Sequence, residues 1–562
     1  MLESPIHAHH LLRYSVEIQD KPTSRSSKTA LVSFYDENNK RVSTHKFSYF
    51  EAEEVYGWIE RGEALNLNSA YVRDFSLNTY RTSKGLDDHV PIELHDFTAR
   101  KAFFDCDTNT DFSLAVFTGA LTNFESSIFA NGYVNFYNCN FGNGEVNFKK
   151  AKFGSGSTTF QSSTFGEGAV SFFNANFGTG NLSFIDANFG KGNVDFRNTY
   201  FGDGVVDFKF AKFEYGDITF QRASFGKGKK DFKNVEFGGG KLDFRGIDFN
   251  DGDVSFEGVE FGNGRVNFRN CRFGNGFKNF ELSDFAEGEA RFEYVSFGTG
   301  MVSFNRSKVN KISLNGCHLN CFMDLRFDQC LLLDLSNTVV RDVVDIKPMG
   351  EKVVIKELNL VDMRILGRVF LNWRENDVHQ LIYVQKSTSL YQKAEQFRIL
   401  KENFRNNGQY EDEDEAYLEF RRCEARAIYE DQMKGGLSQK LGAIPVFWFR
   451  KIVFDKVGNY GTAPVRVLMN SIATVFTFAL LYYLITGYFY EFGHVATTLP
   501  DELNHNHSFW NAAYYSAITF FTVGYGDYFA YGCVKALAAL EGFTGVFMMS
   551  YFTVAFVRKI LR

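Results

Sequence analysis

The chain has 562 residues, of which 44% are hydrophobic and 23% are charged, and its formal net charge is -6. This composition excludes a fully disordered chain, because disordered chains are poor in aromatic residues and this one contains 64 phenylalanines. The acidic balance argues against a general nucleic-acid-binding protein, whose partner is itself an anion. At about 150 residues per domain, the length predicts three or four domains.

Residues 1–63 are predicted to form a small, β-rich cap. Alternating apolar and polar residues in Leu12–Ile18 and Ala30–Tyr35 indicate strands, and Tyr49–Arg61 is typical of a short amphipathic helix. A cap is expected at the end of a repeat structure, because an open end leaves backbone hydrogen-bonding groups unpaired.

A twelve-residue repeat dominates the next part of the chain. Phenylalanine stands at every twelfth position from Phe112 to Phe304 and again from Phe117 to Phe297, and glycine does so from Gly132 to Gly300. An α-helix does not explain this spacing, since positions twelve apart drift by a third of a turn. The stacked coils of a solenoid do explain it, because they superpose equivalent residues.

The volume of the phenylalanine rings predicts the size of each coil. Twelve extended residues enclose too little space for two rings, whereas about 24 residues enclose four rings, one on each side of a square. We therefore expect about 24 residues per coil, with the recurring glycines in bulges at two corners, where they supply a positive φ.

A small residue often stands two places before the second Phe, as at Ala151 and Ala175. This pattern resembles the pentapeptide-repeat family, whose chains wind into a right-handed square β-helix. The resemblance implies a β-helix over residues 64–380, although two extra residues in each twelve depart from the family's spacing.

Four of the eight cysteines also stand two places before an apolar position, where other repeats place alanine: Cys139, Cys271, Cys317 and Cys330. With His318 and Cys321, the last two have the residue types of a zinc site. We interpret them instead as small core residues.

Residues 381–437 are predicted to form a helical hairpin. Apolar residues recur at intervals of three and four in Leu390–Phe404, Asn407-Gly408 breaks the pattern, and Asp414–Glu430 resumes it. We interpret the acidic run Glu411–Glu415 as a solvated first turn favoured by the helix dipole, with ligand binding as the alternative.

Residues 438–466 are predicted to contain an interfacial helix and a linker. Phe447, Trp448 and Phe449 stand beside Arg450 and Lys451, a mixture typical of a helix lying at a membrane surface.

Two long apolar runs follow. Val467–Tyr490 has 24 residues without a charge, and Ala536–Val557 has 22 residues with one charge, Glu541. Each is long enough to cross a hydrocarbon core of about 30 Å as a helix. Phe509–Phe521 is uncharged but too short to cross, which is typical of a re-entrant pore helix.

The basic residues predict the orientation of the two spans. They precede the first span and follow the second: Arg450, Lys451, Lys456, Arg466, Arg558, Lys559 and Arg562. The connecting loop holds Glu491, Asp501 and Glu502 and has no Lys or Arg before Lys535. By the positive-inside rule, we expect both termini in the cytoplasm, and we predict a multi-pass protein of the plasma or inner membrane.

A six-residue segment follows the re-entrant run directly: Thr522, Val523, Gly524, Tyr525, Gly526 and Asp527. In the order span, pore helix, signature, span, it resembles the two-transmembrane class of potassium channels over residues 467–562. The resemblance implies a tetramer in which the carbonyl oxygens of Thr522, Val523, Gly524 and Tyr525 replace the hydration shell of K⁺. Gly524 and Gly526 permit a positive φ, and Asp527 concentrates cations at the outer mouth.

Further residues acquire roles by the same resemblance. Tyr514 and Tyr515 occupy the positions of two aromatic residues that brace the filter, with simple packing as the alternative, and Gly545 resembles the hinge glycine of the second span. Glu541 either hydrogen-bonds behind the filter, faces the pore cavity, or makes an ordinary helix contact. Phe521 departs from the family, which usually has Thr there, and Tyr528-Phe529-Ala530 lacks the usual Pro.

The predicted fold class is multi-domain: an N-terminal right-handed β-helix, a helical connector and a C-terminal all-α two-transmembrane pore domain. The predicted function is a tetrameric, potassium-selective channel of a prokaryotic membrane, with the β-helix as a regulatory or scaffold domain. Its expected partners are membrane lipid, K⁺, further copies of the chain, and an unknown protein or ligand at the β-helix; no cofactor and no nucleic acid are expected. The alternative is a membrane-anchored β-helix scaffold for a protein partner. An enzyme is not expected, since no phosphate loop or catalytic-triad spacing occurs.

Overall fold

The computed structural model describes residues 13–561 except 37, 107, 351–353 and 499–507. Leu12, Asp501, Glu502 and Arg562, which entered the predictions above, therefore lie outside the described residues. The chain divides into two units, Met1–Lys386 and Ser387–Arg562, and each is described by itself.

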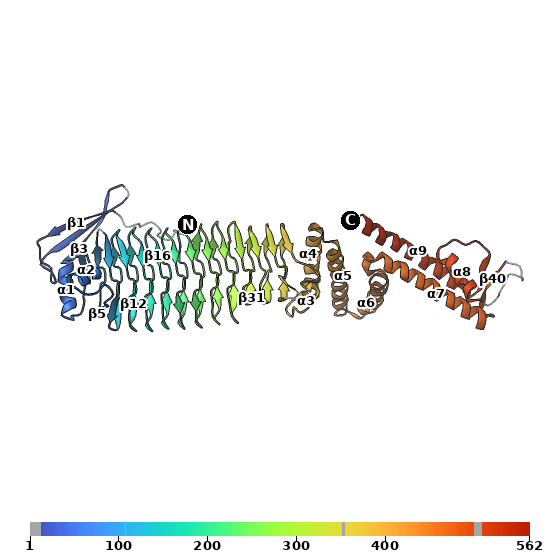
Figure 1. The fold of residues 1–562 in the computed structure, drawn as a ribbon. Helices are drawn as coiled ribbons and strands as arrows, with labels where there is room; N and C mark the ends of the chain where they lie inside the picture. Colours follow the sequence, from blue (N-terminus) through green and yellow to red (C-terminus); the bar gives the residue numbers. More distant parts are fainter. Residues whose placement is uncertain (1–12, 37, 107, 351–353, 499–507, 562) are drawn as a thin grey trace. The chain divides into compact units, whose positions relative to one another are not determined.

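The first unit begins with the antiparallel strands β1 (Arg13–Gln19), β2 (Thr29–Tyr35) and β3 (Arg41–Glu51), followed by α1 (Ala52–Glu60). β3 also pairs in parallel with β4 (Ala70–Arg73), so the last strand of the cap starts the stack of coils (Figure 1). The predicted helical start at Tyr49 is wrong. Tyr49 lies opposite Tyr71 in this pairing, and the strand hydrogen bonds outweigh the helical pattern up to Glu51.

Two long parallel sheets form the walls of the β-helix. The first contains β7 (Asn109–Asp111), β11 (Tyr133–Asn135), β14 (Thr158–Thr159), β16 (Leu182–Ser183), β18 (Val206–Asp207), β21 (Lys230–Asp231), β25 (Val254–Ser255), β28 (Lys278–Asn279), β30 (Met301–Ser303), β33 (Phe322–Asp324), β36 (Val343–Asp345) and β39 (Arg368–Phe370). The second contains β9 (Leu121–Asn123), β12 (Glu145–Asn147), β15 (Val170–Ser171), β17 (Val194–Asp195), β20 (Ile218–Thr219), β23 (Leu242–Asp243), β26 (Val266–Asn267), β29 (Glu289–Arg291), β31 (Lys308–Ser313), β34 (Gln329–Asp334) and β37 (Ile355–Asn359).

Shorter ladders complete the coils. Strands β6 (Phe103–Asp105), β10 (Ile128–Phe129) and β13 (Lys152–Phe153) continue the sheet of the cap. The others are β5 (Ile92–His95) with β8 (Ala115–Thr118), β19 (Lys212–Phe213) with β22 (Glu236–Phe237), β24 (Asp248–Asn250) with β27 (Arg272–Phe273), and β32 (His318–Leu319) with β35 (Val339–Val340) and β38 (Arg364–Ile365). The helices of this unit besides α1 are α2 (Leu77–Ser83) and α3 (Val378–Tyr383).

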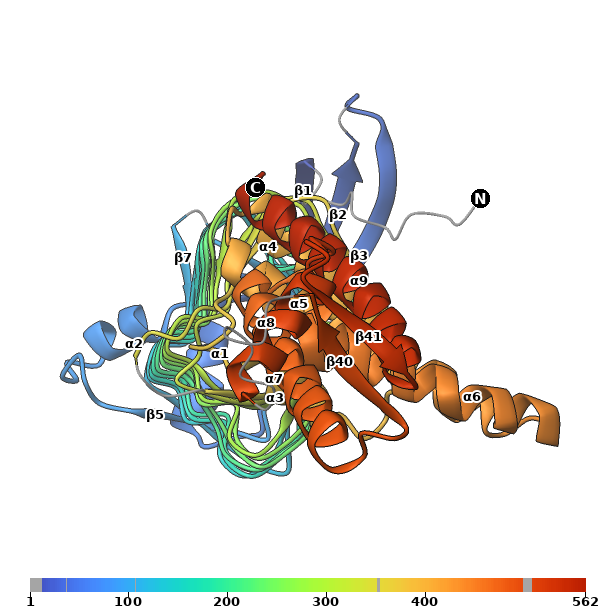
Figure 2. The same ribbon diagram turned by 90° about the vertical axis from the view of Figure 1, so that its right-hand side faces the viewer.

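The predicted 24-residue coil is confirmed. Strand partners are 24 residues apart, as where Val146 pairs with Val170 and Val170 with Val194. Figure 2 shows the coils superposed when viewed along the stack. The ring of Phe208 is fully buried and lies nearly parallel to those of Phe184 and Phe232, with centroids 4.8 and 5.0 Å away. The phenylalanine series thus fills the interior as continuous columns of stacked rings, which is a favourable aromatic geometry.

The recurring glycines have a different role from the one predicted. Of the fifteen glycines spaced twelve apart from Gly132 to Gly300, only Gly252, Gly276 and Gly300 have a positive φ. A Cβ on Gly180 would lie 2.1 Å from the carbonyl oxygen of Gly156 in the adjacent coil. Glycine is needed because neighbouring coils approach too closely at this corner for any side chain. The prediction of a positive φ is therefore wrong for most of the series.

The positive φ falls on another twelve-residue series, which runs from Leu114 to Arg306. Asn174 and Asn198 are typical members, with φ of 56° and 55°. Asparagine tolerates this conformation, whereas bulky side chains such as Phe210 (φ 59°) are strained in it. The repeat therefore fixes the corner geometry even where the individual residue disfavours it.

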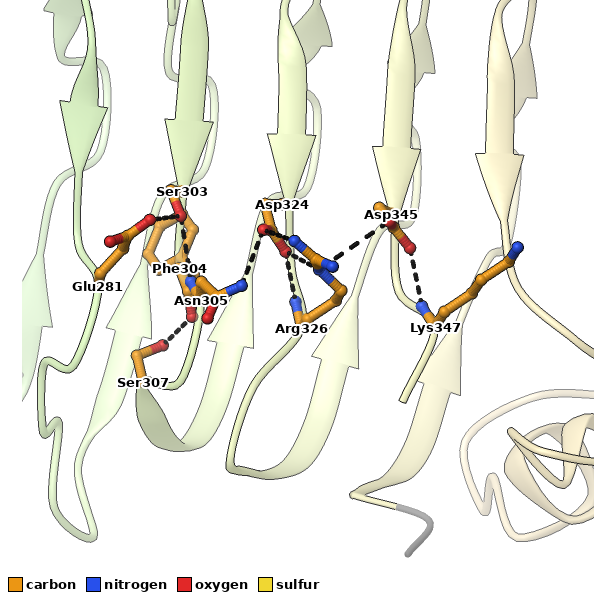
Figure 3. A network of polar contacts seen from close by, with 9 residues as sticks. All are labelled: Glu281, Ser303, Phe304, Asn305, Ser307, Asp324, Arg326, Asp345 and Lys347. Carbon is orange, nitrogen blue, oxygen red and sulfur yellow. Dashed lines mark hydrogen bonds and ion pairs between the residues drawn. The ribbon is translucent and has the colours of Figure 1, made fainter. Parts of the chain in front are cut away.

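Polar side chains join neighbouring coils near the C-terminal end of the β-helix (Figure 3). The Asp324 carboxylate accepts hydrogen bonds from Asn305 Nδ2 at 3.1 Å and Arg326 Nε at 2.8 Å. Burial raises the pKa of Asp324, but the hydrogen bonds from Arg326 and Asn305 outweigh it and hold the pKa below its usual range. Arg326 also faces Asp345 of the next coil at 3.9 Å. The ionised carboxylate therefore contributes to stability at neutral pH.

The second unit is mainly helical. It contains α4 (Leu390–Asn406), α5 (Tyr410–Gln432), α6 (Leu437–Phe449), the π-helix η1 (Arg450–Lys456), the short helix η2 (Asn459–Gly461), α7 (Pro464–Tyr488), α8 (Phe509–Phe520) and α9 (Val534–Ile560), with strands β40 (Gly493–Thr497) and β41 (Tyr528–Gly532). α4 starts with a capping box between Ser389 and Gln392, and α4 and α5 pack as a hairpin.

The interpretation of Glu411–Glu415 as a solvated turn is wrong in part. Glu411, Asp412 and Glu413 do form the first turn of α5, where negative charge is favourable. The side chains of Glu413 and Asp414, however, are buried. Asp414 faces basic residues at the end of α9, a contact between distant segments that local sequence did not indicate.

Replacement of Gly180 by Ala tests the close approach of the coils. We expect the variant to lose about 1–3 kcal/mol of stability, because the new methyl group forces the coils apart. The measurement is thermal unfolding of the purified chain, followed by circular dichroism of the β-structure. The matched control is Gly239→Ala, whose Cβ would meet only the Tyr215 ring, at 4.0 Å. Equal losses in the two variants would contradict the packing role of the glycine series.

Candidate functional site

Two helices of the second unit, α7 and α9, are long and apolar enough to cross a membrane, and most of each is exposed in the single chain. The shorter α8 packs against both of them. It begins after Ser508, whose hydroxyl caps the helix by accepting a hydrogen bond from the Trp510 N–H at 3.2 Å. Twelve residues of helix extend only about 18 Å, which is too short to cross.

The end of α8 rests directly on α9 at Gly545. A Cβ at this position would lie 2.0 Å from the carbonyl oxygen of Phe520, the last residue of α8. Glycine is therefore required by close packing, and α9 runs as one helix through this point. The hinge role that resemblance assigns to Gly545 stays a prediction.

The segment after α8 has an alternating backbone. Thr522, Gly524 and Gly526 have positive φ values of 54°, 57° and 82°, whereas Val523 and Tyr525 do not. The backbone therefore alternates between left-handed and ordinary φ values along these five residues, which glycine permits at two of the three left-handed positions. The Val523 N–H donates to the Ile518 carbonyl at 2.8 Å, which fixes the segment to the last turn of α8.

A two-stranded sheet holds the other end of this segment. β41 pairs antiparallel with β40, and Tyr528 lies opposite Thr497. The Asp527 carbonyl accepts hydrogen bonds from the Thr498 N–H at 2.9 Å and the Thr497 hydroxyl at 2.8 Å. The segment is thus anchored at both ends. The sequence analysis missed this sheet, because each strand has only five residues and no tight turn joins them.

The Glu541 carboxylate is completely buried among three helices. The Tyr482 hydroxyl of α7 donates to one of its oxygens at 2.6 Å. The Ser516 hydroxyl of α8 is in hydrogen-bond contact with the other oxygen, and it lies 2.8 Å from the Val475 carbonyl. In the single chain the carboxylate is therefore hydrogen-bonded between helices, and its proposed position behind the filter stays a prediction. Tyr482 and Ser516 were missed, although polar residues in apolar helices are a usable signal.

The two tyrosines of α8 lie in different surroundings. The Tyr515 ring is buried and meets the Tyr482 ring edge-on, with centroids 5.0 Å apart. The Tyr514 ring meets that of Tyr528 at 5.7 Å, beside the end of the alternating segment. Tyr515 therefore packs between helices, and Tyr514 contacts β41. Their bracing of a filter stays a prediction.

The opposite end of α9 is connected to α5. The Asp414 carboxylate lies 3.1 Å from Lys559 Nζ and 3.4 Å from Arg558 Nη2. The Arg558 guanidinium also lies over the Tyr417 ring, 4.2 Å from its centroid. On the same helix, Arg422 pairs with Asp455 of η1 at 2.8 Å. Charge pairs thus link α5 both to the segment before α7 and to the last turn of α9.

Groups of three or more His, Cys, Asp or Glu side chains that could hold a metal ion are absent from the part of the chain that the structure describes. The cysteines of the repeat are buried. Cys139, for example, directs its Sγ at the carbonyl of Phe112, at 3.0 Å. The place of alanine in the repeat thus also accepts a thiol that donates to the backbone.

Residues 471–562 match a protein-family model described as "Ion channel". Searches of the curated proteins and of the solved structures gave no match. The matched residues include α8, the alternating segment and α9, together with most of α7. The chain is therefore a membrane protein in which an ion-channel domain is fused to a repeat β-helix.

Replacement of Tyr482 by Phe tests the Glu541 contact. We expect the variant to lose about 1–3 kcal/mol of stability, because a buried carboxylate oxygen loses its donor. The measurement is the unfolding midpoint of the purified protein in detergent. Tyr483→Phe, on the same helix, is the matched control, since its ring packs edge-on against Phe509 and its hydroxyl has no hydrogen-bond partner among the described residues. Equal unfolding midpoints of the two variants would show that the hydrogen bond between Tyr482 and Glu541 does not stabilise the protein.

Proposed function

We propose that the protein is a potassium-selective channel. The observation that carries the proposal is the alternating backbone at Thr522, Gly524 and Gly526, fixed between α8 and β41 within a matched ion-channel domain. Aligned carbonyl oxygens of Thr522, Val523, Gly524 and Tyr525 replace the water around K⁺ and supply the binding sites of the filter. Asp527 adds negative charge at the outer mouth.

One chain supplies only one side of such a filter, so the channel is a homotetramer around a central axis. The side chains of Val523 and Tyr525 support this assembly. They are 48% and 74% exposed in the single chain, although both are bulky and Val523 is wholly apolar. In the tetramer they pack against the neighbouring pore helix and hold the ring open. The basic flanks of the spans support a topology with both termini in the cytoplasm, which is proposed here for a prokaryotic cell.

The cytoplasmic part regulates the pore through α5. Asp414 contacts the end of α9, and Arg422 contacts η1 before α7, so both ends of the channel domain meet one helix. A displacement of α5 changes the free energy of the open and closed states differently only if these contacts differ between them. The β-helix passes the signal of its protein or ligand partner to this hairpin. As an alternative, the β-helix is a scaffold for that partner and the channel domain serves as its anchor.

Replacement of Gly524 by Ala tests selectivity. We expect the wild type in liposomes to pass K⁺ at least about a hundredfold faster than Na⁺, and the variant to lose K⁺ flux, because a Cβ disfavours the φ of 57°. The control is Gly542→Ala, whose Cβ would meet only the Thr519 carbonyl oxygen at 3.8 Å. Equal Na⁺ and K⁺ flux through the wild type would exclude a potassium filter, and no flux at all would favour the scaffold.

Replacement of Asp414 by Asn tests regulation through α5. We expect the open probability to change by roughly fivefold or more, because the pairs to Arg558 and Lys559 are lost. Single-channel recording in one lipid is the measurement. Glu415→Gln, which removes an exposed charge from the same turn, should leave the open probability unchanged. An unchanged open probability in Asp414→Asn would contradict the regulatory contact.

A further inference from the structure

A cavity of about 520 Å³ lies among α5, η1, η2 and α9. Arg421 and Arg450 line one part of it, and Phe547 and Val554 of α9 line another. The cavity therefore combines two guanidinium groups with an apolar wall. The cavity adjoins the link between α5 and α9, because the Tyr417 ring beneath Arg558 is also in its wall, but none of its residues has been assigned to conduction.

The two arginines leave the cavity with an excess of positive charge. Arg421 Nη1 donates to Glu424 at 2.6 Å, but its Nε is buried without a hydrogen-bond partner among the described residues. Among the residues that the structure describes, Arg450 has neither an ion pair nor a side-chain hydrogen bond. The nearby Asp455 carboxylate is occupied by Arg422, at 2.8 Å. Because two like charges share a partly enclosed space, an anion between them is stabilised.

The position of the cavity along α9 indicates what kind of anion it holds. Ser550, in its wall, precedes the basic Arg558 by eight residues, or about 12 Å of helix. Phe547 lies deeper in the same span. The arginines come from α5 and η1, which are not among the two helices long and apolar enough to cross a membrane. A ligand that fills the cavity needs a negative head for the arginines and an apolar chain for α9.

We propose that this cavity binds an anionic phospholipid of the membrane. The phosphate lies between Arg421 and Arg450, whose forked donors suit its oxygens, and an acyl chain follows Phe547 and Val554. The bound lipid bridges α5 and α9 beside the Asp414 contact and so adds to the attachment of the hairpin to the pore. This role rests on α9 crossing the membrane as proposed, and does not depend on which ion is conducted.

Lipid binding is measured by native mass spectrometry of the full chain in neutral detergent, titrated with phosphatidylglycerol or phosphatidylcholine. The wild type should prefer the anionic lipid, and the double variant Arg421→Gln/Arg450→Gln should lose roughly 25-fold in that preference, since each basic side chain contributes about fivefold. The control Arg405→Gln/Arg426→Gln removes two exposed charges from α4 and α5 and should retain the preference. Arg450→Lys should retain most of it.

Four results would overturn the proposal. The first is an unchanged preference in the Arg421→Gln/Arg450→Gln variant, and the second is an equal loss in the control. The third is displacement of phosphatidylglycerol by about 10 mM inorganic phosphate, which would identify a soluble anion as the ligand. A wild type without any preference would mean that another copy of the chain fills the cavity, and would also overturn it. Failure of K⁺ selectivity would leave all of these readouts unaffected.

Discussion

Close contact between backbone and backbone, which only glycine permits, organises both units of this protein. In the β-helix, the space for a side chain at Gly180 is taken by the Gly156 carbonyl of the adjacent coil. In the channel domain, the Phe520 carbonyl takes the corresponding space at Gly545. A methyl group at either place would separate elements whose remaining contacts depend on that distance. In the β-helix the distance sets the stacking of the phenylalanine columns, and in the channel domain it sets the position of the segment that follows α8.

The repeat shows which parts of a fold can be predicted from sequence and which cannot. The coil length followed from periodicity and ring volume, because both act on every repeat and a single error would not alter the result. The reason for the recurring glycine could not be derived in the same way. A positive φ and a close approach both select glycine, and only coordinates distinguish them. The actual positive-φ series, from Leu114 to Arg306, is chemically varied and therefore gave no signal, although Asn recurs in it.

The channel domain divides along a similar line. Its spans and pore helix were predictable because hydrophobic length is a property of consecutive residues. The partners of Glu541 were not, since Tyr482 and Ser516 are 59 and 25 residues away and lie on different helices. The β40–β41 sheet and the Asp414 contact were missed for the same reason. Each of the missed features is a contact between two distant segments, and neither periodicity nor residue spacing relates the two segments in the sequence.

The charge pairs of α5 connect this helix to both ends of the channel domain. Asp414 is only 8% exposed. Solvent therefore screens its ion pairs with Arg558 and Lys559 less than it screens those of a surface carboxylate. Arg422 and Asp455 form a second contact, which joins α5 to η1, the helix that precedes α7. A displacement of α5 therefore either breaks the contact between Asp414 and the end of α9 or moves α9 with it. A coupling free energy of about 1–3 kcal/mol between two sites corresponds to a change in affinity of about fivefold to a hundredfold. The proposed regulation through α5 therefore needs only a few partly buried pairs on one helix, and it needs no continuous rigid path through the β-helix.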